Sequence, residues 1–293
     1  AGLSPGIAPE SQFARRLAES GCRVIIPDLI SRKMTRRQSD YGGWGSELSH
    51  REYLYRSAYE MGRHIAGYEV QTVLSLVDWI EAHQGPERRR IGVMGYGEGG
   101  MIALYAGALD PRINTVGVSG YFGPRENIWE QPISRNIFGL LEQFGDAELA
   151  TLIVPRSLVI EAAPGPVADL PGKGGAPAKL AGPDPGEVYT EVERARQLLT
   201  SYVEEIPIRL ILGSGLPFGS EPALEVFLDN LRLGLKPGPS KPITPSIPDT
   251  TVFEARQQRL IAAWDRHTQQ TLVRSPYIRK EFMKSLNHEI LKL

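Results

Sequence analysis

The residues with the most chemical content form the hexapeptide Gly95-Tyr96-Gly97-Glu98-Gly99-Gly100. It follows the apolar run 91–94 and precedes the helix-like run 101–108. A strand, a sharp glycine-bounded turn and a helix are the setting of the G-x-S-x-G nucleophile elbow, whose central residue presents an oxygen or sulfur. The first and fifth residues fit the flanking glycines, but Gly97 stands where the nucleophile would be. The motif therefore predicts the elbow without its reacting atom.

Steric arguments favour Gly97 as the centre of this turn. The central residue of an elbow has φ > 0, which glycine adopts freely and a residue with a Cβ adopts only under strain. Shifting the register by one residue would make Glu98 the centre. Tyr96 would then occupy a position that requires a small residue, so this register is disfavoured.

The same glycines also match the spacing of the G-x-G-x-x-G dinucleotide-binding turn. A Rossmann-type nucleotide-binding oxidoreductase is therefore an alternative. Three observations count against it: an apparent strand at 22–27 precedes the motif, Glu98 would place a carboxylate beside the pyrophosphate, and Ser119-Gly120-Tyr121 stands where the ribose-binding acid is expected.

Composition sets further limits on function. The chain has 293 residues, of which 41% are hydrophobic and 23% charged, with a net charge of -1. This charge balance does not favour nucleic-acid binding, and the sequence contains no basic run interleaved with aromatic residues. No apolar stretch reaches the roughly 20 residues needed to span a bilayer. The single cysteine, Cys22, excludes an intrachain disulfide and a multi-cysteine metal site, and no motif predicts a metal or a cofactor.

Short apolar runs alternate with helical patterns through most of the chain, which predicts an α/β fold with a mostly parallel sheet covered by helices on both faces. We expect a Pro/Gly-rich surface loop at 163–186 and a long polar loop at 31–48. Strands are predicted at 22–27, 90–94, 113–119, 156–162 and 206–212, and helices at 9–20, 52–83 with breaks near Gly62 and Gly67, 99–109, 187–202 and 221–233.

The pattern also predicts three parts of the chain. Residues 1–233 form the α/β domain, 234–250 a proline-rich linker, and 251–293 a helical appendage or connector to a further domain. The appendage contains two amphipathic patterns, one on Phe253, Leu260 and Trp264 and the other on Ile278, Phe282, Leu286 and Ile290. Because the chain starts at Ala1, directly before the first helix, we expect it to be a fragment that lacks the N-terminal part of the domain.

Several stretches together resemble the α/β-hydrolase fold and, within it, the dienelactone hydrolase and acetyl xylan esterase-like group of bacterial proteins. The resemblance covers roughly residues 9–233 and implies an esterase-like protein, with a leaning toward an exported one. The matching stretches are Gly95-Tyr96 and Gly99-Gly100, the strand before them, Ala108-Leu109-Asp110-Pro111-Arg112, residues 136–141 leading into Asp146-Ala147, and residues 155–160.

Members of this group use a Ser or Cys nucleophile, an acid after a later strand and a His after the last strand. Here Gly97 occupies the nucleophile position, Glu161 and Asp169 are weak candidates for the acid, and the loop 213–219 contains no His. The resemblance therefore implies a protein inactive as a Ser/Cys hydrolase, with a structural or ligand-binding role. The alternative is an active ester hydrolase with rearranged residues, in which Glu98 or Glu161 acts as the base.

A pocket at the C-terminal edge of the sheet is the expected remnant of the site, because α/β folds bind ligands there. The resemblance implies a small ester or carbohydrate as its ligand, or a second domain of a longer chain as partner. The five histidines are expected to have surface or capping roles: His50, His64, His83, His267 and His288. The residues predicted to line the pocket are Tyr96, Gly97, Glu98, Tyr121 and Arg125.

Overall fold

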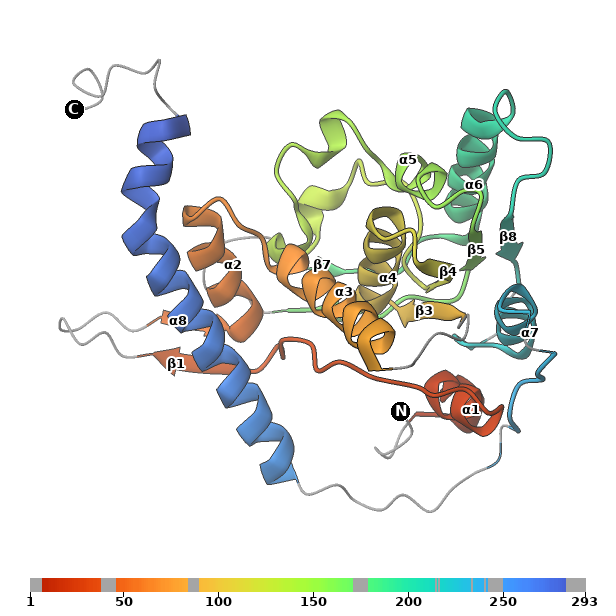
Figure 1. Cartoon of the computed structure of the whole chain (residues 1–293), viewed down its shortest axis with the longest axis horizontal. Coiled ribbons are helices and arrows are strands. Elements are labelled where there is room, and N and C mark those ends of the chain that lie inside the picture. Colours follow the sequence, from red (N-terminus) through yellow and green to blue (C-terminus); the bar gives the residue numbers. More distant parts are fainter. Residues whose placement is uncertain are drawn as a thin grey trace. The chain divides into compact units, whose positions relative to one another are not determined.

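A parallel four-stranded sheet lies at the centre of the fold in the computed structural model (Figure 1). Its strands β3 (Ile91–Tyr96), β4 (Ile113–Ser119), β5 (Ser157–Glu161) and β8 (Ile208–Ile211) pair in chain order. The structure describes residues 7–37, 46–83, 90–170, 179–213, 215, 217–232, 234–239, 241 and 250–282. The four strands confirm the runs predicted around 90–94, 113–119, 156–162 and 206–212.

Helices cover both faces of this sheet, as predicted. Successive side chains of a strand point to opposite faces, so Val116 and Gly117 of β4 face different layers. Helix α4 (Glu98–Leu109) packs on the first face, where a Cβ on Gly107 would lie 2.3 Å from Val116 Cγ2. Helix α7 (Glu221–Asn230) covers the other, where a Cβ on Gly117 would lie 3.2 Å from Phe227 Cδ2.

A hydrophobic core fills the space between α7, the sheet and helix α1 (Phe13–Glu19). Burying each such aliphatic or aromatic side chain contributes roughly 1.5–3 kcal/mol. Gly238, within the predicted linker, also contacts α1, because its N–H donates to the Arg16 carbonyl at 3.2 Å. The core residues are Leu17, Val159, Leu224, Phe227, Leu228 and Leu231.

The remaining elements between residues 9 and 199 that pack around the sheet are short, apart from the helices α3 and α6. The predicted loop 163–186 contains a small antiparallel pairing of β6 (Ala168–Asp169) with β7 (Lys179–Leu180). The other elements are η1 (Pro9–Ser11), α3 (Ile65–His83), η2 (Ile128–Glu130), η3 (Ile133–Arg135), η4 (Leu140–Glu142), α5 (Asp146–Thr151) and α6 (Pro185–Leu199).

The strand predicted at 22–27 is wrong, because these residues pair with no strand among those that the structure describes. Cys22 and Val24 pack against the core, whereas Ile25 and Ile26 are 38% and 57% exposed. The segment is therefore only partly buried, through Cys22 and Val24. A central strand needs neighbouring strands that pair with its backbone N–H and C=O groups, and an apolar run alone does not supply them.

The chain divides into two compact units, residues 1–27 with 66–248 and residues 28–65 with 249–293. The sequence did not indicate that 28–65 groups with the C-terminal helix, and the boundaries 1–233, 234–250 and 251–293 remain a prediction. The long loop predicted at 31–48 is wrong in part, because β1 (Met34–Arg37) pairs antiparallel with β2 (Ser46–Ser49).

Helices supply most of the second unit. The helical pattern 52–83 breaks at Gly62, whose φ is +66°, and its first part is α2 (His50–Glu60). Gly67 lies inside α3 and does not break it. The two amphipathic patterns of the tail fall on one helix, α8 (Thr250–Phe282), while Leu286 and Ile290 lie outside the described residues.

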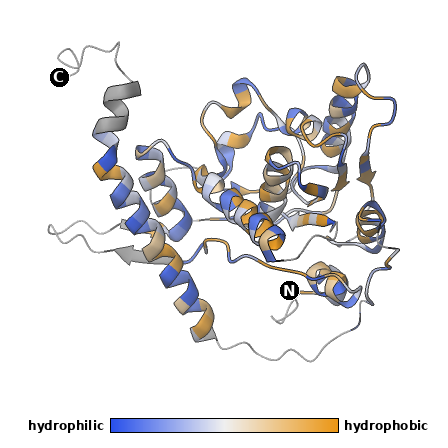
Figure 2. Cartoon of the chain, in the orientation of Figure 1, coloured by the Kyte–Doolittle hydropathy of each residue, from blue (hydrophilic) through white to orange (hydrophobic). Residues whose placement is uncertain are grey.

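Hydrogen bonds join α8 to the segment before β1. Gln257 accepts from the Ser31 N–H at 3.0 Å and donates to the Leu29 carbonyl at 2.9 Å. Hydropathy along the helices is mixed, as Figure 2 shows, and no helix in the described ranges has the length and apolar character needed to cross a membrane.

Candidate functional site

The turn between β3 and α4 keeps the geometry of a nucleophile elbow. Gly97 has φ +55° and ψ -116°, a conformation that strains any residue with a Cβ. Its N–H donates to the Ser119 carbonyl at 2.9 Å, which fixes the turn beside the end of β4. A Cβ on Gly95 would lie 2.0 Å from the Gly99 carbonyl oxygen, so helix and strand meet at backbone contact.

The space that a nucleophile side chain would need is occupied by Pro166. A Cβ on Gly97 would lie 2.9 Å from Pro166 Cγ and 3.0 Å from Cδ. The loop that carries this proline is tied to the elbow, because the Tyr96 hydroxyl donates to the Pro164 carbonyl at 3.0 Å. A proline ring cannot rotate away as a flexible side chain does, so Pro166 itself would have to shift to admit a serine.

An aromatic residue lies where the resemblance expects the catalytic histidine. Phe218, in the loop after β8, stacks on Tyr96 with ring centroids 3.8 Å apart and an interplanar angle of 14°. Phe13 packs edge-on against the Phe218 ring. Arg16, which is buried, donates to the Gly219 carbonyl at 3.3 Å and pairs with Glu221. Stacking on Tyr96 therefore places Phe218 against the elbow, and Arg16 of α1 binds the end of this loop and the start of α7.

Glu161, the first candidate acid, binds neighbouring donors with both of its oxygens. It ends β5, is buried, and accepts from the N–H groups of Gly219 at 2.8 Å and Ser220 at 2.9 Å and from the Ser119 hydroxyl. A carboxylate at the start of α7 complements the positive end of the helix dipole. Glu161 thus joins three segments of the fold. Asp169, the second candidate, is exposed in β6.

Glu98, the candidate base beside the elbow, forms an ion pair with Arg135. It is the first residue of α4 and accepts from Arg135 Nε at 2.9 Å. Arg135 is only 5% exposed, and its guanidinium lies 5.8 Å from the centre of the Tyr121 ring. Glu98 Oε2 is therefore engaged by Arg135 and is not free to accept a proton from a ligand in this arrangement.

A cavity of about 160 Å³ opens at the C-terminal edge of the sheet, just after β4. The loop 120–135, residues 179–183 and Glu187 of α6 supply its lining. Two residues predicted for a pocket, Tyr121 and Arg125, line it, whereas Tyr96, Gly97 and Glu98 are not among its lining residues. Their role in ligand binding stays a prediction.

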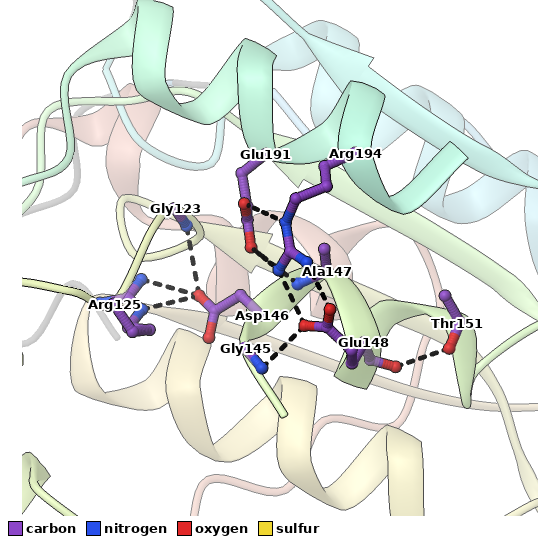
Figure 3. Close-up of polar contacts among 9 residues, drawn as sticks. All are labelled: Gly123, Arg125, Gly145, Asp146, Ala147, Glu148, Thr151, Glu191 and Arg194. Atoms are coloured by element: carbon purple, nitrogen blue, oxygen red, sulfur yellow. Dashed lines mark hydrogen bonds and ion pairs between the residues drawn. The ribbon is translucent and has the colours of Figure 1, made fainter. Parts of the chain in front are cut away.

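Arg125, which lines this cavity, forms a buried ion pair with Asp146 (Figure 3). Asp146, at the start of α5, accepts from Arg125 Nε at 2.9 Å and from the Gly123 N–H at 3.2 Å. Arg125 also donates to the Tyr121 carbonyl and lies 4.0 Å from the centre of its ring. Burial raises the pKa of Asp146, and the Arg125 guanidinium opposes that shift. The contacts fix the orientation of Arg125 at the cavity wall.

Two tyrosines beside this pair stay protonated. Burial raises the pKa of Tyr105 to about 12, and its side chain hydrogen-bonds with that of Tyr121. Burial likewise raises the pKa of the Tyr121 hydroxyl. Neither phenol is therefore suited to act as a base near neutral pH.

A second charged cluster in Figure 3 ties α5 to α6. Arg194 binds Glu148 through both terminal nitrogens and binds Glu191 through Nε at 2.9 Å. Glu148 also accepts from the Gly145 N–H at 2.8 Å, and Glu191 accepts from the Ala147 N–H at 3.0 Å. The start of α5, and with it Asp146, is positioned by these contacts.

Stability should depend on pH through Glu148. Hydrogen bonding to Arg194 lowers the pKa of Glu148 from its usual 4.5 to about 2. A lowered carboxyl pKa stabilises the folded state above pH 4.5, and this contribution is lost as the pH falls toward 2. We expect Glu148→Gln to cost about 1–2 kcal/mol at pH 7, a value reduced for solvent screening.

Urea unfolding of the wild type and Glu148→Gln from pH 7 downward checks this expectation. The gap between the two proteins should narrow as the pH falls below 4.5. Glu193→Gln is the matched control, because Glu193 pairs with Arg196 only one turn away on α6, and it should cost less than about 0.5 kcal/mol. A gap that stays constant with pH would contradict the role given to Glu148.

The described histidines have local partners. His83 lies in the last turn of α3, with Nδ1 2.9 Å from the Trp79 carbonyl and its ring stacked on the Trp79 ring. His50 Nδ1 lies 2.9 Å from the Ser31 hydroxyl, and His64 packs edge-on against Tyr55. His267 packs edge-on against Trp264, and His288 lies outside the described residues.

Comparison with known proteins agrees with the elbow geometry and the parallel sheet. Residues 4–141 match the dienelactone hydrolase family. This match over part of the chain confirms the resemblance inferred from the glycine turn. The matched range contains the elbow, β4 and Arg135, and it ends before β5 and β8.

One solved structure similar to this chain is a carbohydrate esterase family 15 glucuronoyl esterase from Caldicellulosiruptor kristjansonii. The identity is 16% and the TM-score 0.40, and the similarity covers 64% of this chain. The chain spans 56% of that protein's length. Comparison with curated proteins gives no match.

Arg135 is the main site residue that sequence reasoning missed. A signal was available, since it follows β4 in the same polar segment as Arg125 and thus belongs to the same edge of the sheet. The segment was not predicted to turn back, because the short helices η2 and η3 have no strong periodic pattern. Pro166 and Phe218 had no signal, since only the folded loops bring them to the elbow.

Proposed function

We propose that this dienelactone hydrolase-like protein does not hydrolyse esters through a Ser or Cys nucleophile and instead has a structural or ligand-binding role. One observation carries the proposal: Gly97 keeps the elbow conformation while Pro166 occupies the space of the missing side chain. Phe218 in place of a histidine adds support. Loss of one triad member already costs on the order of 10⁴-fold in rate.

An ester hydrolase that uses Glu98 or Glu161 as its base is the alternative. It is less favoured because Arg135 pairs with Glu98, and two backbone N–H groups and a hydroxyl bind Glu161. A carboxylate that abstracts a proton needs an oxygen within reach of that proton. Either residue would have to leave its present partners first.

Sheet order argues against a dinucleotide-binding role. With residues 22–27 outside any ladder, β3 is the first strand of the parallel sheet, so the objection from a preceding strand no longer holds. The order β3-β4-β5-β8 nevertheless puts β3 at an edge, with every later strand on one side. Dinucleotides bind where the strand order reverses, and the described sheet contains no such point at the glycine turn.

Two assays on the full chain test the proposal. We expect the wild type to hydrolyse p-nitrophenyl acetate no faster than buffer, and Gly97→Ser to gain no labelling by a fluorophosphonate probe. Circular dichroism checks that Gly97→Ser is folded. The double variant Gly97→Ser/Pro166→Gly removes the proline ring and so restores space for the serine at the elbow. Wild-type hydrolysis that Glu98→Gln or Glu161→Gln abolishes would overturn the proposal. Labelling of Gly97→Ser alone would contradict the role given to Pro166 in filling the nucleophile space.

A further inference from the structure

The cavity after β4 shares no lining residue with the elbow. Its lining comes from the loop 120–135, residues 179–183 and Glu187. Its volume of about 160 Å³ equals the space of roughly five water molecules. The cavity therefore suits a molecule of about four to eight non-hydrogen atoms, well below the size of a drug-like ligand.

The lining carries more negative than positive charge. Its two buried arginines are neutralised by ion pairs, Arg125 with Asp146 and Arg135 with Glu98. The other charged residues of the lining are exposed, and they are Glu126, Glu130, Glu187 and Lys179. Three carboxylates against one ammonium leave an excess of two negative charges. This balance favours a cation over an anion or a neutral molecule.

The carboxylates of the lining are not arranged as ligands of a metal ion. Among the residues that the structure describes, no three His, Cys, Asp or Glu side chains come together as such ligands would. A hard divalent cation takes about six or more oxygen ligands around one point. An ammonium group has separate N–H donors, and each can go to a different carboxylate. The charges therefore favour an organic cation.

Arg135 adds a second requirement, because the protein leaves one of its donors without a partner. The buried Arg135 side chain donates through Nε to Glu98 at 2.9 Å and through Nη1 to Gln131, another lining residue, at 3.2 Å. Its Nη2 is buried and has no partner among the described residues. A buried donor without an acceptor costs free energy, which an oxygen atom bound beside it recovers. The ligand should therefore carry such an oxygen.

A molecule with an ammonium group and a neutral oxygen meets both requirements. The ammonium N–H groups donate to the carboxylates, while a hydroxyl or amide oxygen accepts from Arg135 Nη2. A carboxylate oxygen would add to the excess of negative charge and is disfavoured. We propose that this cavity binds a small organic monocation, a primary ammonium compound with a neutral hydroxyl or amide oxygen. Arg135 binds the oxygen, and the exposed carboxylates bind the ammonium group.

This inference deepens the ligand-binding role proposed above and rests on it, but its residues are not those of the elbow. Ester hydrolysis would overturn the proposed function and leave the charges of the cavity as they are. Failure to bind an ammonium compound would overturn this inference and leave the inactive elbow as it is. The two can therefore be tested separately.

Matched probes of similar shape test the inference in saturation-transfer NMR titrations of the full chain at neutral pH. Ethanolamine carries both an ammonium and a hydroxyl group. In n-propylamine a methyl group replaces the hydroxyl, and in ethylene glycol a hydroxyl replaces the ammonium. Glycine keeps the ammonium and has a carboxylate in place of the neutral oxygen. Each probe thus changes one group of ethanolamine.

We expect ethanolamine to bind with a Kd on the order of 10 mM. The affinity for n-propylamine should be about threefold to tenfold lower, because the hydrogen bond from the guanidinium is lost. Ethylene glycol and glycine should bind about tenfold more weakly than ethanolamine, because one lacks the positive charge and the other adds a negative one. No saturation transfer to ethanolamine, or equally tight binding of any other probe, would overturn the inference.

Arg135→Lys tests the contact with the oxygen. Lysine keeps a positive charge opposite Glu98 but has no group equivalent to Nη2. The affinity for ethanolamine should fall about threefold to tenfold, while n-propylamine should bind as it does to the wild type. Circular dichroism checks that the variant is folded. An equal loss for both amines, or no loss for ethanolamine, would overturn the role given to Arg135.

Charge variants test the contact with the ammonium group. Glu130→Gln should weaken the binding of both amines about threefold, and Lys179→Met should tighten it about threefold, because it removes the opposing ammonium of the lining. Glu142→Gln is the control, since it removes the same charge from the exposed side of helix η4 outside the lining, and it should bind as the wild type does. Amine binding unchanged in Glu130→Gln, or equally weakened in Glu142→Gln, would overturn the assignment to this cavity.

Discussion

Replacing Gly95 with alanine should destabilise the protein by about 3 kcal/mol or more, or prevent it from folding. The added Cβ would lie 2.0 Å from the Gly99 carbonyl oxygen, 2.1 Å from its carbon and 2.7 Å from the Gly100 nitrogen. All three are backbone atoms in the first turn of α4, so no side-chain rotation relieves the contact. The helix would have to move away from β3 and lose its packing on β4.

Gly99→Ala is the matched control for this substitution, only four residues away. A Cβ on Gly99 meets nothing within 4 Å, and alanine is favoured over glycine in a helix by up to about 1 kcal/mol. Urea unfolding should therefore show Gly99→Ala at or slightly above wild-type stability. If Gly95→Ala unfolds at the same urea concentration as Gly99→Ala, the close approach of strand and helix at the elbow is wrong.

The elbow also shows why the sheet could be predicted from sequence. Runs such as 158–160 are apolar on both faces, as is typical of a strand covered by helices on both sides. The glycine turn after β3 then fixed where strand and helix meet. Residues 22–27 are equally apolar, but the sequence does not contain the information that no neighbouring strand pairs with them. Pairing is a property of the assembled sheet and not of the run itself.

The candidate site, like the sheet, could be predicted from the sequence only in part. The missing nucleophile is a local fact, visible at Gly97 in the sequence. That Pro166 and Phe218 occupy the space around it depends on two loops far apart in the chain, and no spacing predicts their contact with the elbow. Glu161 ends a buried strand, as the sequence indicates, and its role as an acid stays a prediction. Its partners come from the end of β4 and the loop after β8. Sequence identified the chemical groups, and the tertiary structure determined whether they are available.

Removing the charge of Asp146 should be the costliest change behind the cavity, at about 3 kcal/mol for Asp146→Asn. Asp146 and Arg125 are 1% and 8% exposed, so the substitution leaves a guanidinium buried without its counter-charge. It also weakens the acceptor of the Gly123 N–H. Most of the cost comes from the unpaired charge, because burying an ion is expensive wherever its partner is absent.

Thermal and urea unfolding of Asp146→Asn measure this cost, and two further variants show its origin. Glu254→Gln breaks the Lys33–Glu254 pair, whose side chains are 63% and 54% exposed, and should cost less than about 0.5 kcal/mol. Arg125→Met combined with Asp146→Leu removes both charges and should be more stable than Asp146→Asn, because no buried ion is left unpaired. If Asp146→Asn instead costs no more than Glu254→Gln, water reaches the Arg125 guanidinium in solution. The wall of the cavity at Arg125 would then be open to solvent.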